Sequence, residues 1–128
     1  MTQLFAAIGS ILALAGVLAR SLSSHAIRQI LEERGKLDSF NLAADYLLFH
    51  GLALIAIAIL CHLFPNGKYH QAGWALLLGS IFFQGTVLLK SFISIHPFGF
   101  LTPLGGFILM IGWGLLFFAA LQGNNIAE

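Results

Sequence analysis

The stretch from Leu42 to Phe64, LAADYLLFHGLALIAIAILCHLF, decides the fold. It carries one formal charge, at Asp45, and it exceeds the ~20 apolar residues that an α-helix needs to cross a bilayer. Backbone N–H and C=O groups in hydrocarbon must pair within their own segment, so this run predicts a transmembrane helix. The turn sequence Pro65-Asn66-Gly67 follows it and predicts where the helix ends.

Three further apolar runs lie on either side of this stretch, at residues 4–22, 74–95 and 104–121. With 42–64 they predict an all-α, integral membrane four-helix bundle, a single transmembrane domain over residues 1–128. The runs are too continuous for barrel strands, in which apolar and polar residues alternate over about ten residues.

The first run, 4–22, has an alternative interpretation as a cleaved signal peptide. Its sequence Ala13-Leu14-Ala15 resembles a cleavage site. However, no lysine or arginine precedes the run, and signal peptides begin with a positively charged region. We therefore expect a retained span, with cleavage as the alternative.

The composition of the chain indicates that lipid is its solvent. Of its 128 residues, 59% are hydrophobic and 9% are charged, whereas a soluble domain has about 25% charged residues. The formal net charge of +1 leaves no basic surface for nucleic acid. The only cysteine is Cys61, so no disulfide can form within the chain. We expect the lipid bilayer itself to be the main partner.

The positions of lysine and arginine predict how the helices are oriented. With four spans, both termini lie on one side and the connections 23–41 and 96–103 lie on the other. The side with these connections has five cations and the opposite side has only Lys68. The five are Arg20, Arg28, Arg34, Lys36 and Lys90. Because positively charged flanks stay in the cytoplasm, we expect a multi-pass protein of the cell inner (plasma) membrane with both termini outside the cytoplasm.

The first connection, 23–41, is predicted to contain a short amphipathic helix at the membrane surface. Ser23 or Ser24 can cap this helix and Gly35 suits its C-terminal end. Its apolar side is formed by Ala26, Ile27, Ile30 and Leu31, and its charged side by Arg28, Glu32, Glu33 and Arg34. Such a helix lies in the interface. Asp38 can then cap the second span.

Polar residues gather at the predicted cytoplasmic ends of the spans, and ionisable residues within a membrane are candidates for functional sites. We expect Tyr46 and His50, four residues apart, to share a hydrogen bond, and Asp45 to pair with Arg20 or Lys90. The candidate ligand-binding residues are His25, Asp45, Tyr46, His50, Lys90 and His96.

Three interpretations of this polar layer stay open. In the first it is structural, with Lys90 and Arg20 extending to the headgroups. In the second it is a pocket for a lipid headgroup or another small ligand. In the third, His25, His50 and His96 form a metal or proton site. Metal sites often have ligands at fixed short spacing, which this chain lacks, so we expect no metal and no cofactor.

Small residues in the first, third and fourth runs predict close helix packing, either within one bundle or in a homo-oligomer. Gly9 and Ala13 are examples in the first run. Gln84 carries an amide that needs a partner in hydrocarbon, and we expect it to bond across helices. Trp113, in the middle of the fourth run, is expected to be a packing residue.

Several of these residues together resemble a known family. Ser24-His25-Ala26 follows the first run, Tyr46-x-x-x-His50-Gly51-Leu52-Ala53-Leu54 lies in the second, and 79–89 lies in the third. The most specific piece is Leu101-Thr102-Pro103-Leu104-Gly105-Gly106, which leads to Gly112-Trp113. Over nearly its whole length the chain resembles the DUF423 family of small bacterial inner-membrane proteins.

The resemblance implies a four-span inner-membrane protein and supplies neither a substrate nor a catalytic mechanism. It directs attention to His25, Tyr46 and His50, and to a structural motif of Thr102, Pro103, Gly105 and Gly106. In this motif we expect the threonine to cap the helix, the proline to open it and the glycines to permit close packing. The chain departs from the family pattern at 20–23, Leu47 and Lys90.

The residues carry no catalytic constellation: no nucleophile elbow, phosphate loop, HExxH or CxxC sequence is present. We therefore expect a non-enzymatic scaffold or accessory subunit of a membrane complex. The alternative is a lipid- or ion-binding or transport protein that uses the polar layer near the cytoplasmic face. Because four spans are few for a transport path, that alternative requires an oligomer. An enzyme acting on a membrane-embedded substrate is a third hypothesis.

Overall fold

The computed structural model describes residues 2–126, with side chains through Gln122. Four segments are long and apolar enough to cross a membrane: Thr2–Ser24, Leu37–Leu63, Tyr69–Lys90 and Phe98–Gln122. The described residues form helices and connections without any strand. The prediction of an all-α membrane four-helix bundle is therefore confirmed.

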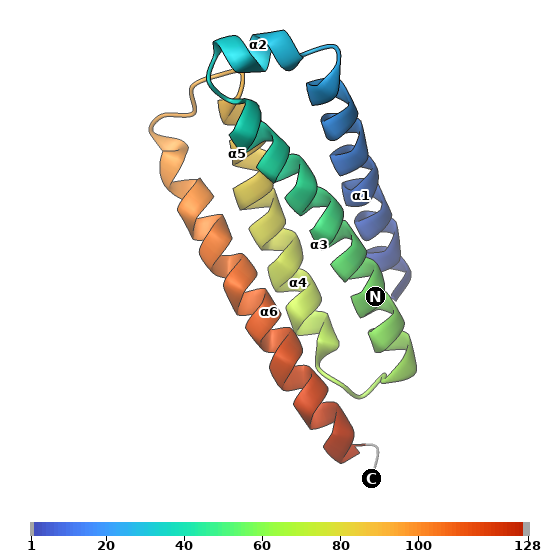
Figure 1. Ribbon diagram of the computed structural model, residues 1–128. Coiled ribbons are helices and arrows are strands. Elements are labelled where there is room, and N and C mark those ends of the chain that lie inside the picture. Colours follow the sequence, from blue (N-terminus) through green and yellow to red (C-terminus); the bar gives the residue numbers. More distant parts are fainter. Residues whose placement is uncertain (1, 127–128) are drawn as a thin grey trace.

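The chain order of the elements is simple. The helices are α1 (Thr2–Ser24), α2 (Arg28–Glu33), α3 (Leu37–Leu63), α4 (Tyr69–Ser80), α5 (Thr86–Lys90) and α6 (Leu101–Ile126). A π-helical turn, η1 (Ile81–Gly85), joins α4 to α5 within the third span, and a 3₁₀ turn, η2 (Phe98–Phe100), leads into α6. Figure 1 shows α2 and the connection from α5 to α6 at one end of the bundle, which we call the connection end. The turn from α3 to α4 lies at the opposite end.

The spans begin and end at different residues from those expected from the apolar runs. The second span begins at Leu37 rather than at residue 42, and the third covers Tyr69–Lys90 rather than 74–95. Phe40 and Tyr69 are buried in these added turns, while polar neighbours on the other side of each turn are exposed. At such a helix end one side is buried and the other side carries exposed polar residues. These polar residues lower the mean hydropathy, so the turn is not recognised as part of an apolar run.

The short helix between the first two spans is confirmed as α2, but its capping differs from the prediction. Ser23 and Ser24 lie in the last turn of α1, where both hydroxyls donate to the carbonyl of Arg20. The N-cap of α2 is Ile27, without a side-chain cap bond. Asp38 lies in the first turn of α3, and the N-cap Lys36 makes no side-chain cap bond.

The predicted C-terminal role of Gly35 is confirmed. Its φ of 66° lies in the left-handed region that glycine adopts without a steric penalty. The N–H of Lys36 donates to the carbonyl of Leu31 at 2.8 Å, and the N–H of Gly35 donates to Glu32 at 3.1 Å. This bond pattern reverses the chain after α2 and directs it into α3. Leu31 is thereby fully buried against the bundle.

The predicted close packing of small residues occurs within the chain. A Cβ placed on Gly9 of α1 would lie 2.5 Å from the carbonyl oxygen of Gly51 in α3, and one on Gly16 would lie 2.6 Å from that of Ala44. The α1 and α3 backbones therefore touch. Between α4 and α6, Gly79 packs against Leu109 in the same way. Close backbone approach replaces the hydrophobic effect as the force between helices in lipid.

All four spans contribute to one apolar core. Its buried members include Phe5, Leu54, Leu76 and Leu109, from α1, α3, α4 and α6 respectively. The ring of Phe5 also meets Trp74 edge-on at a centroid distance of 5.3 Å. A smaller core near the connection end consists of Ala19, Leu31, Phe40 and Ala44. These two cores hold the polar groups at defined depths.

Candidate functional site

The predicted polar layer is divided among several places in the structure. One part ties α1 to α3 near the connection end. Arg20 Nε lies 3.1 Å from Asp45 Oδ1, which confirms the expected pairing of Asp45. One turn closer to the connection, Ser23 Oγ donates to Asn41 Oδ1 at 2.6 Å. Both ties join the two helices of the first hairpin.

The three histidines of the proposed metal or proton site lie in separate places. His25 is exposed in the turn from α1 to α2, His50 is buried within α3, and His96 lies in the connection after α5. Among the residues that the structure describes, no three His, Cys, Asp or Glu side chains are placed to hold one metal ion. The three histidines therefore do not form the joint site that we considered.

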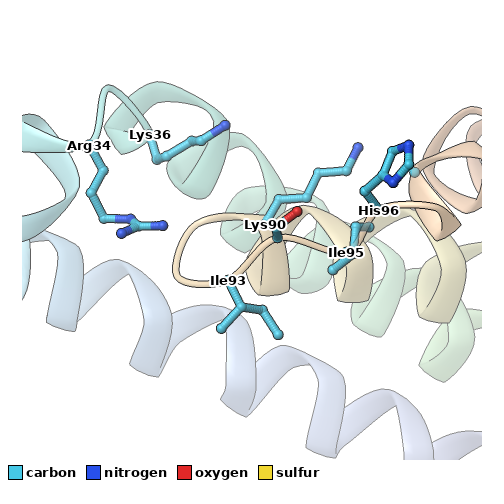
Figure 2. Close-up of a pocket in the computed structure, with 8 residues that line it drawn as sticks. Arg34, Lys36, Lys90, Ile93, Ile95 and His96 are labelled. Carbon is cyan, nitrogen blue, oxygen red and sulfur yellow. The ribbon is translucent and has the colours of Figure 1, made fainter.

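A cavity of about 410 Å³ opens at the connection end, and we call it the connection pocket. Its lining combines nitrogen-bearing side chains from three segments of the chain. Arg34 and Lys36 come from the link between α2 and α3, Lys90 from the end of α5, and His96 from the connection that follows, as Figure 2 shows. Ile93 and Ile95 give the same pocket apolar surface.

Arg34 is held in place by the connection itself. Its Nε donates to the carbonyl of Ser91 at 2.6 Å. Ser91 is fully buried, and its hydroxyl donates to the carbonyl of Val87. The guanidinium therefore uses its Nε as an anchor, and its terminal nitrogens keep their donors for another partner.

The charges of the connection pocket are of one sign. Arg34, Lys36 and Lys90 are cations at neutral pH, and the lining includes no acidic side chain. In the part of the chain that the structure describes, the ion pairs within 4.0 Å are Arg20–Asp45 and Arg28–Glu32, and neither involves these three cations. Like charges that share a site repel one another and favour an anionic partner.

A second group of polar side chains lies in the middle of the membrane. His50 was expected in the cytoplasmic third, but its neighbour Gly51 packs against Gly9 and Ala13, near the midpoint of α1. The added turns at the start of α3 account for this difference. We call His50, Ser80, Gln84 and Trp113 the mid-membrane cluster.

The bonds of His50 define its tautomer. Trp113 Nε1–H donates to His50 Nε2 at 3.1 Å, so Nε2 is the acceptor and Nδ1 carries the proton. Nδ1 then donates to the carbonyl of Tyr46 at 2.8 Å. The predicted bond between the two side chains is therefore replaced by a bond from His50 to the backbone carbonyl of Tyr46.

Gln84 completes the mid-membrane cluster from η1. Its Nε2 lies 3.3 Å from His50 Nδ1 and 3.3 Å from Ser80 Oγ, to which it donates. With Nδ1 protonated both nitrogens are donors, so Gln84 touches His50 across helices without the hydrogen bond that we expected, and it donates to Ser80 of its own span instead. Gln84 is fully buried, and within the described chain its Oε1 has no hydrogen-bond partner. A buried acceptor without a donor costs free energy.

A lateral cavity of about 510 Å³ adjoins this cluster, and we call it the lateral pocket. Its floor includes His50 and Leu109, which are both 5% exposed. Its rim includes Phe49, Met110 and Trp113, which face outward from spanning helices. The other lining residues are Tyr46, Phe83 and Gly106. The pocket therefore opens sideways toward the hydrocarbon.

The motif at the start of α6 supports this pocket. Thr102 lies inside the helix and does not cap it, because η2 already begins the helical turn at Phe98. Its hydroxyl instead bonds the hydroxyl of Thr86 at 2.5 Å. A Cβ on Gly105 would lie 2.7 Å from the backbone of Phe82, whereas one on Gly106 would lie 3.5 Å from the ring of Phe83. Pro103 is the third residue of α6 and is exposed, so it lies inside the helix and does not open it as we expected.

The sequence did not identify Trp113, Arg34 and Lys36 as members of these two pockets. Trp113 was expected to be a packing residue, yet its N–H is the hydrogen-bond donor to His50. An indole N–H in mid-span needs an acceptor, and that was the available signal. Arg34 and Lys36 were read as surface charges of a connection, and only the fold places them beside Lys90.

Known proteins match most of this chain. The family model described as "Protein of unknown function (DUF423)" matches residues 19–106. A UPF0382 membrane protein of Staphylococcus haemolyticus is 28% identical over 89% of this chain and 92% of its own length. The UPF0382 membrane protein YwdK of Bacillus subtilis is 27% identical over 94% and 98%, respectively. One from Schizosaccharomyces pombe is 33% identical over 85% and 97%.

No solved structure matches the chain. The family match includes His25, His50 and every lining residue of the connection pocket, and it ends at Gly106, before Trp113. The relatives extend the similarity through nearly the whole chain, and each is named a membrane protein. This chain is therefore a membrane protein, and it belongs to the DUF423 family.

Proposed function

We propose that the protein binds an anionic phospholipid headgroup in the connection pocket. The observation that carries this proposal is the meeting of Arg34, Lys36 and Lys90 around one cavity without a carboxylate. His96 adds a further nitrogen to the lining. Phosphate oxygens are the partners that arginine and lysine recognise in common, arginine through its planar fork.

The position of the pocket suits an amphiphile better than a soluble anion. Its lining combines the cations with Ile93 and Ile95, and it lies where the spanning helices end. Each lysine or arginine near an anionic membrane surface is worth about 1 kcal/mol of attraction. A lipid whose phosphate meets the cations can lay its chains along the outer surfaces of the neighbouring helices.

The charge distribution also supports the orientation that we propose. The connections 25–36 and 91–100 lie at one end of the bundle, as Figure 1 shows, and five of the six lysines and arginines lie at or near them. Lys68 follows α3 at the other end. By the positive-inside rule the connection end is cytoplasmic, and both termini lie outside the cytoplasm of a plasma or bacterial inner membrane.

The scaffold or accessory-subunit hypothesis stays a prediction. It rested partly on small-residue helix surfaces that a partner helix could use. Gly9, Gly16 and Gly51 make their close contacts within the chain, so these surfaces are already occupied. Lipid binding has the connection pocket in its favour.

Native mass spectrometry of the protein released from nanodiscs tests the proposal. We expect phosphatidylglycerol to be retained in preference to phosphatidylcholine. The double variant Arg34→Gln/Lys90→Gln should weaken that retention about thirty-fold, because two cations at about 1 kcal/mol each are removed. Lys68→Gln, at the opposite end, is the matched control and should leave retention unchanged.

A second experiment tests whether the connection pocket binds a lipid headgroup or a free anion. Inorganic phosphate is titrated into protein held in phosphatidylcholine nanodiscs, and its effect on the thermal midpoint is followed. We expect little stabilisation by phosphate and a clear rise with phosphatidylglycerol. Equal retention of both lipids, or a loss that Lys68→Gln reproduces, would refute a specific site in the connection pocket.

A further inference from the structure

We propose that the lateral pocket binds an uncharged, ring-containing alcohol or phenol dissolved in the membrane. The hydroxyl of this ligand would insert between Trp113 and His50. The inference concerns a different cavity from the connection pocket, and it is independent of anionic lipid binding. It rests on the hydrogen-bonding groups, the lining and the depth of the pocket.

The hydrogen-bonding groups of the pocket match a hydroxyl. Trp113 offers one N–H, and His50 Nε2 is the acceptor that now receives it. A hydroxyl group accepts one hydrogen bond and donates another, so it can satisfy both groups when it separates them. A carbonyl or ether oxygen could accept from Trp113 but would leave His50 Nε2 without a donor.

The lining selects an apolar ring. Tyr46, Phe49 and Phe83 surround the cavity with aromatic surface, and the rings of Tyr46 and Phe83 have centroids 5.5 Å apart. Aromatic rings in offset or edge-on contact gain attraction beyond their buried area. The volume of about 510 Å³ lies within the range of small-molecule sites.

The depth and charge of the pocket select a neutral ligand. None of its lining residues is an Asp, Glu, Lys or Arg. Its polar groups lie at the level of the α1 midpoint, where a charged group is costly. The rim residues Phe49 and Met110 face the hydrocarbon, so a ligand enters from the membrane rather than from water.

Gln84 lies beside His50, on its Nδ1 side, and is not part of the lining of the lateral pocket. Its side chain is fully buried beside His50, and Oε1 has no hydrogen-bond partner among the described residues. Helix packing alone would favour an apolar side chain at this position, because a partly satisfied polar network is less favourable than an apolar core. His50, an ionisable residue within the membrane, lines the open cavity and is a candidate for a functional site.

Three probes of matched shape test this inference: 4-decylphenol, 4-decylanisole and decylbenzene. Each is added to the full-length protein in phosphatidylcholine nanodiscs, and the rise of the thermal midpoint gives its affinity. We expect the phenol to bind about ten-fold more tightly than the anisole, which can accept but not donate a hydrogen bond. Decylbenzene should bind no better than the anisole. Equal affinities of the three probes would overturn the proposal.

Variants then locate the site. His50→Phe keeps an aromatic ring but removes the acceptor. Phenol and anisole can then both only accept from the Trp113 N–H, so the roughly ten-fold preference for the phenol over the anisole should disappear. Gly106→Leu places a side chain in the lateral pocket and should abolish the stabilisation by all three probes. Gly114→Leu is the control, because a Cβ there meets nothing within 4 Å. Phenol binding that survives in Gly106→Leu, or a preference for the phenol over the anisole that survives in His50→Phe, would overturn the proposal.

Discussion

The connection pocket and the lateral pocket have similar volumes and opposite chemistry. The first gathers Arg34, Lys36 and Lys90 where the spans end. The second places neutral His50 and Trp113 among aromatic side chains in mid-membrane. The difference teaches that depth in the bilayer determines which polar groups a small membrane protein can use. Charged side chains are tolerated at the membrane surface, where headgroups and water solvate them. In the hydrocarbon, which cannot solvate them, neutral donor–acceptor pairs are found instead.

The most direct test of this difference between the pockets is to introduce one charge into each of them. Met110→Lys should lower the free energy of unfolding by about 3 kcal/mol, because it places an ammonium group at the rim of the lateral pocket within the hydrocarbon. Ile93→Lys, in the connection pocket, should change it by less than about 0.5 kcal/mol. Unfolding in mixtures of dodecylmaltoside and dodecylsulfate measures both. Equal costs would show that the two pockets have the same surroundings.

Two adjacent glycines at the start of α6 have different surroundings: Gly105 is tightly packed, and Gly106 faces the lateral pocket. Gly105→Ala should lower the free energy of unfolding by about 2 kcal/mol, because the new methyl group overlaps the backbone of Phe82. Gly106→Ala should change it by less than about 0.5 kcal/mol, because its methyl group meets only the Phe83 ring, at 3.5 Å. The same unfolding assay compares the two. A larger loss for Gly106→Ala than for Gly105→Ala would contradict the open wall of the lateral pocket.

The smallest expected effect concerns the amide beside His50. Gln84→Met keeps the length of the side chain and removes its unpartnered oxygen, so the free energy of unfolding should stay within about 0.5 kcal/mol or rise. Ser10→Ala, at an exposed hydroxyl on α1, provides a reference for a change at the lipid-facing surface. If Gln84→Met cost more than about 2 kcal/mol, the amide as a whole, including its bond to Ser80, would stabilise the fold.

Hydropathy predicted the number of spans, because the energetic demand for apolar residues and internal hydrogen bonds applies to every membrane helix. It misplaced the start of the second span because Asp38 and Ser39 lower the hydropathy of a turn in which Phe40 is buried. It also extended the third span past Lys90, into the apolar residues Ile93 and Ile95. Those residues line the connection pocket instead of continuing the helix.

The candidate sites were predicted only in part, for a geometric reason. Spacing along one helix identifies neighbours within that helix, as it did for Tyr46 and His50. It does not give the axial position of one helix against another, and that position brings Trp113 of α6 to His50 of α3. The ion pair of Arg20 and Asp45 was predictable because both residues flank one short connection. Arg34 meets the 91–97 segment through a bond to Ser91, far along the chain.

The pairing of α1 with α3 also has a consequence for the order of assembly. Gly9 meets Gly51, Arg20 meets Asp45 and Ser23 meets Asn41, so every one of these ties joins residues within the first half of the chain. A ribosome that has released residues 2–63 into the bilayer has already supplied both sides of each tie. The first hairpin can therefore close while the second is still being translated, and α4 and α6 then dock onto a finished template.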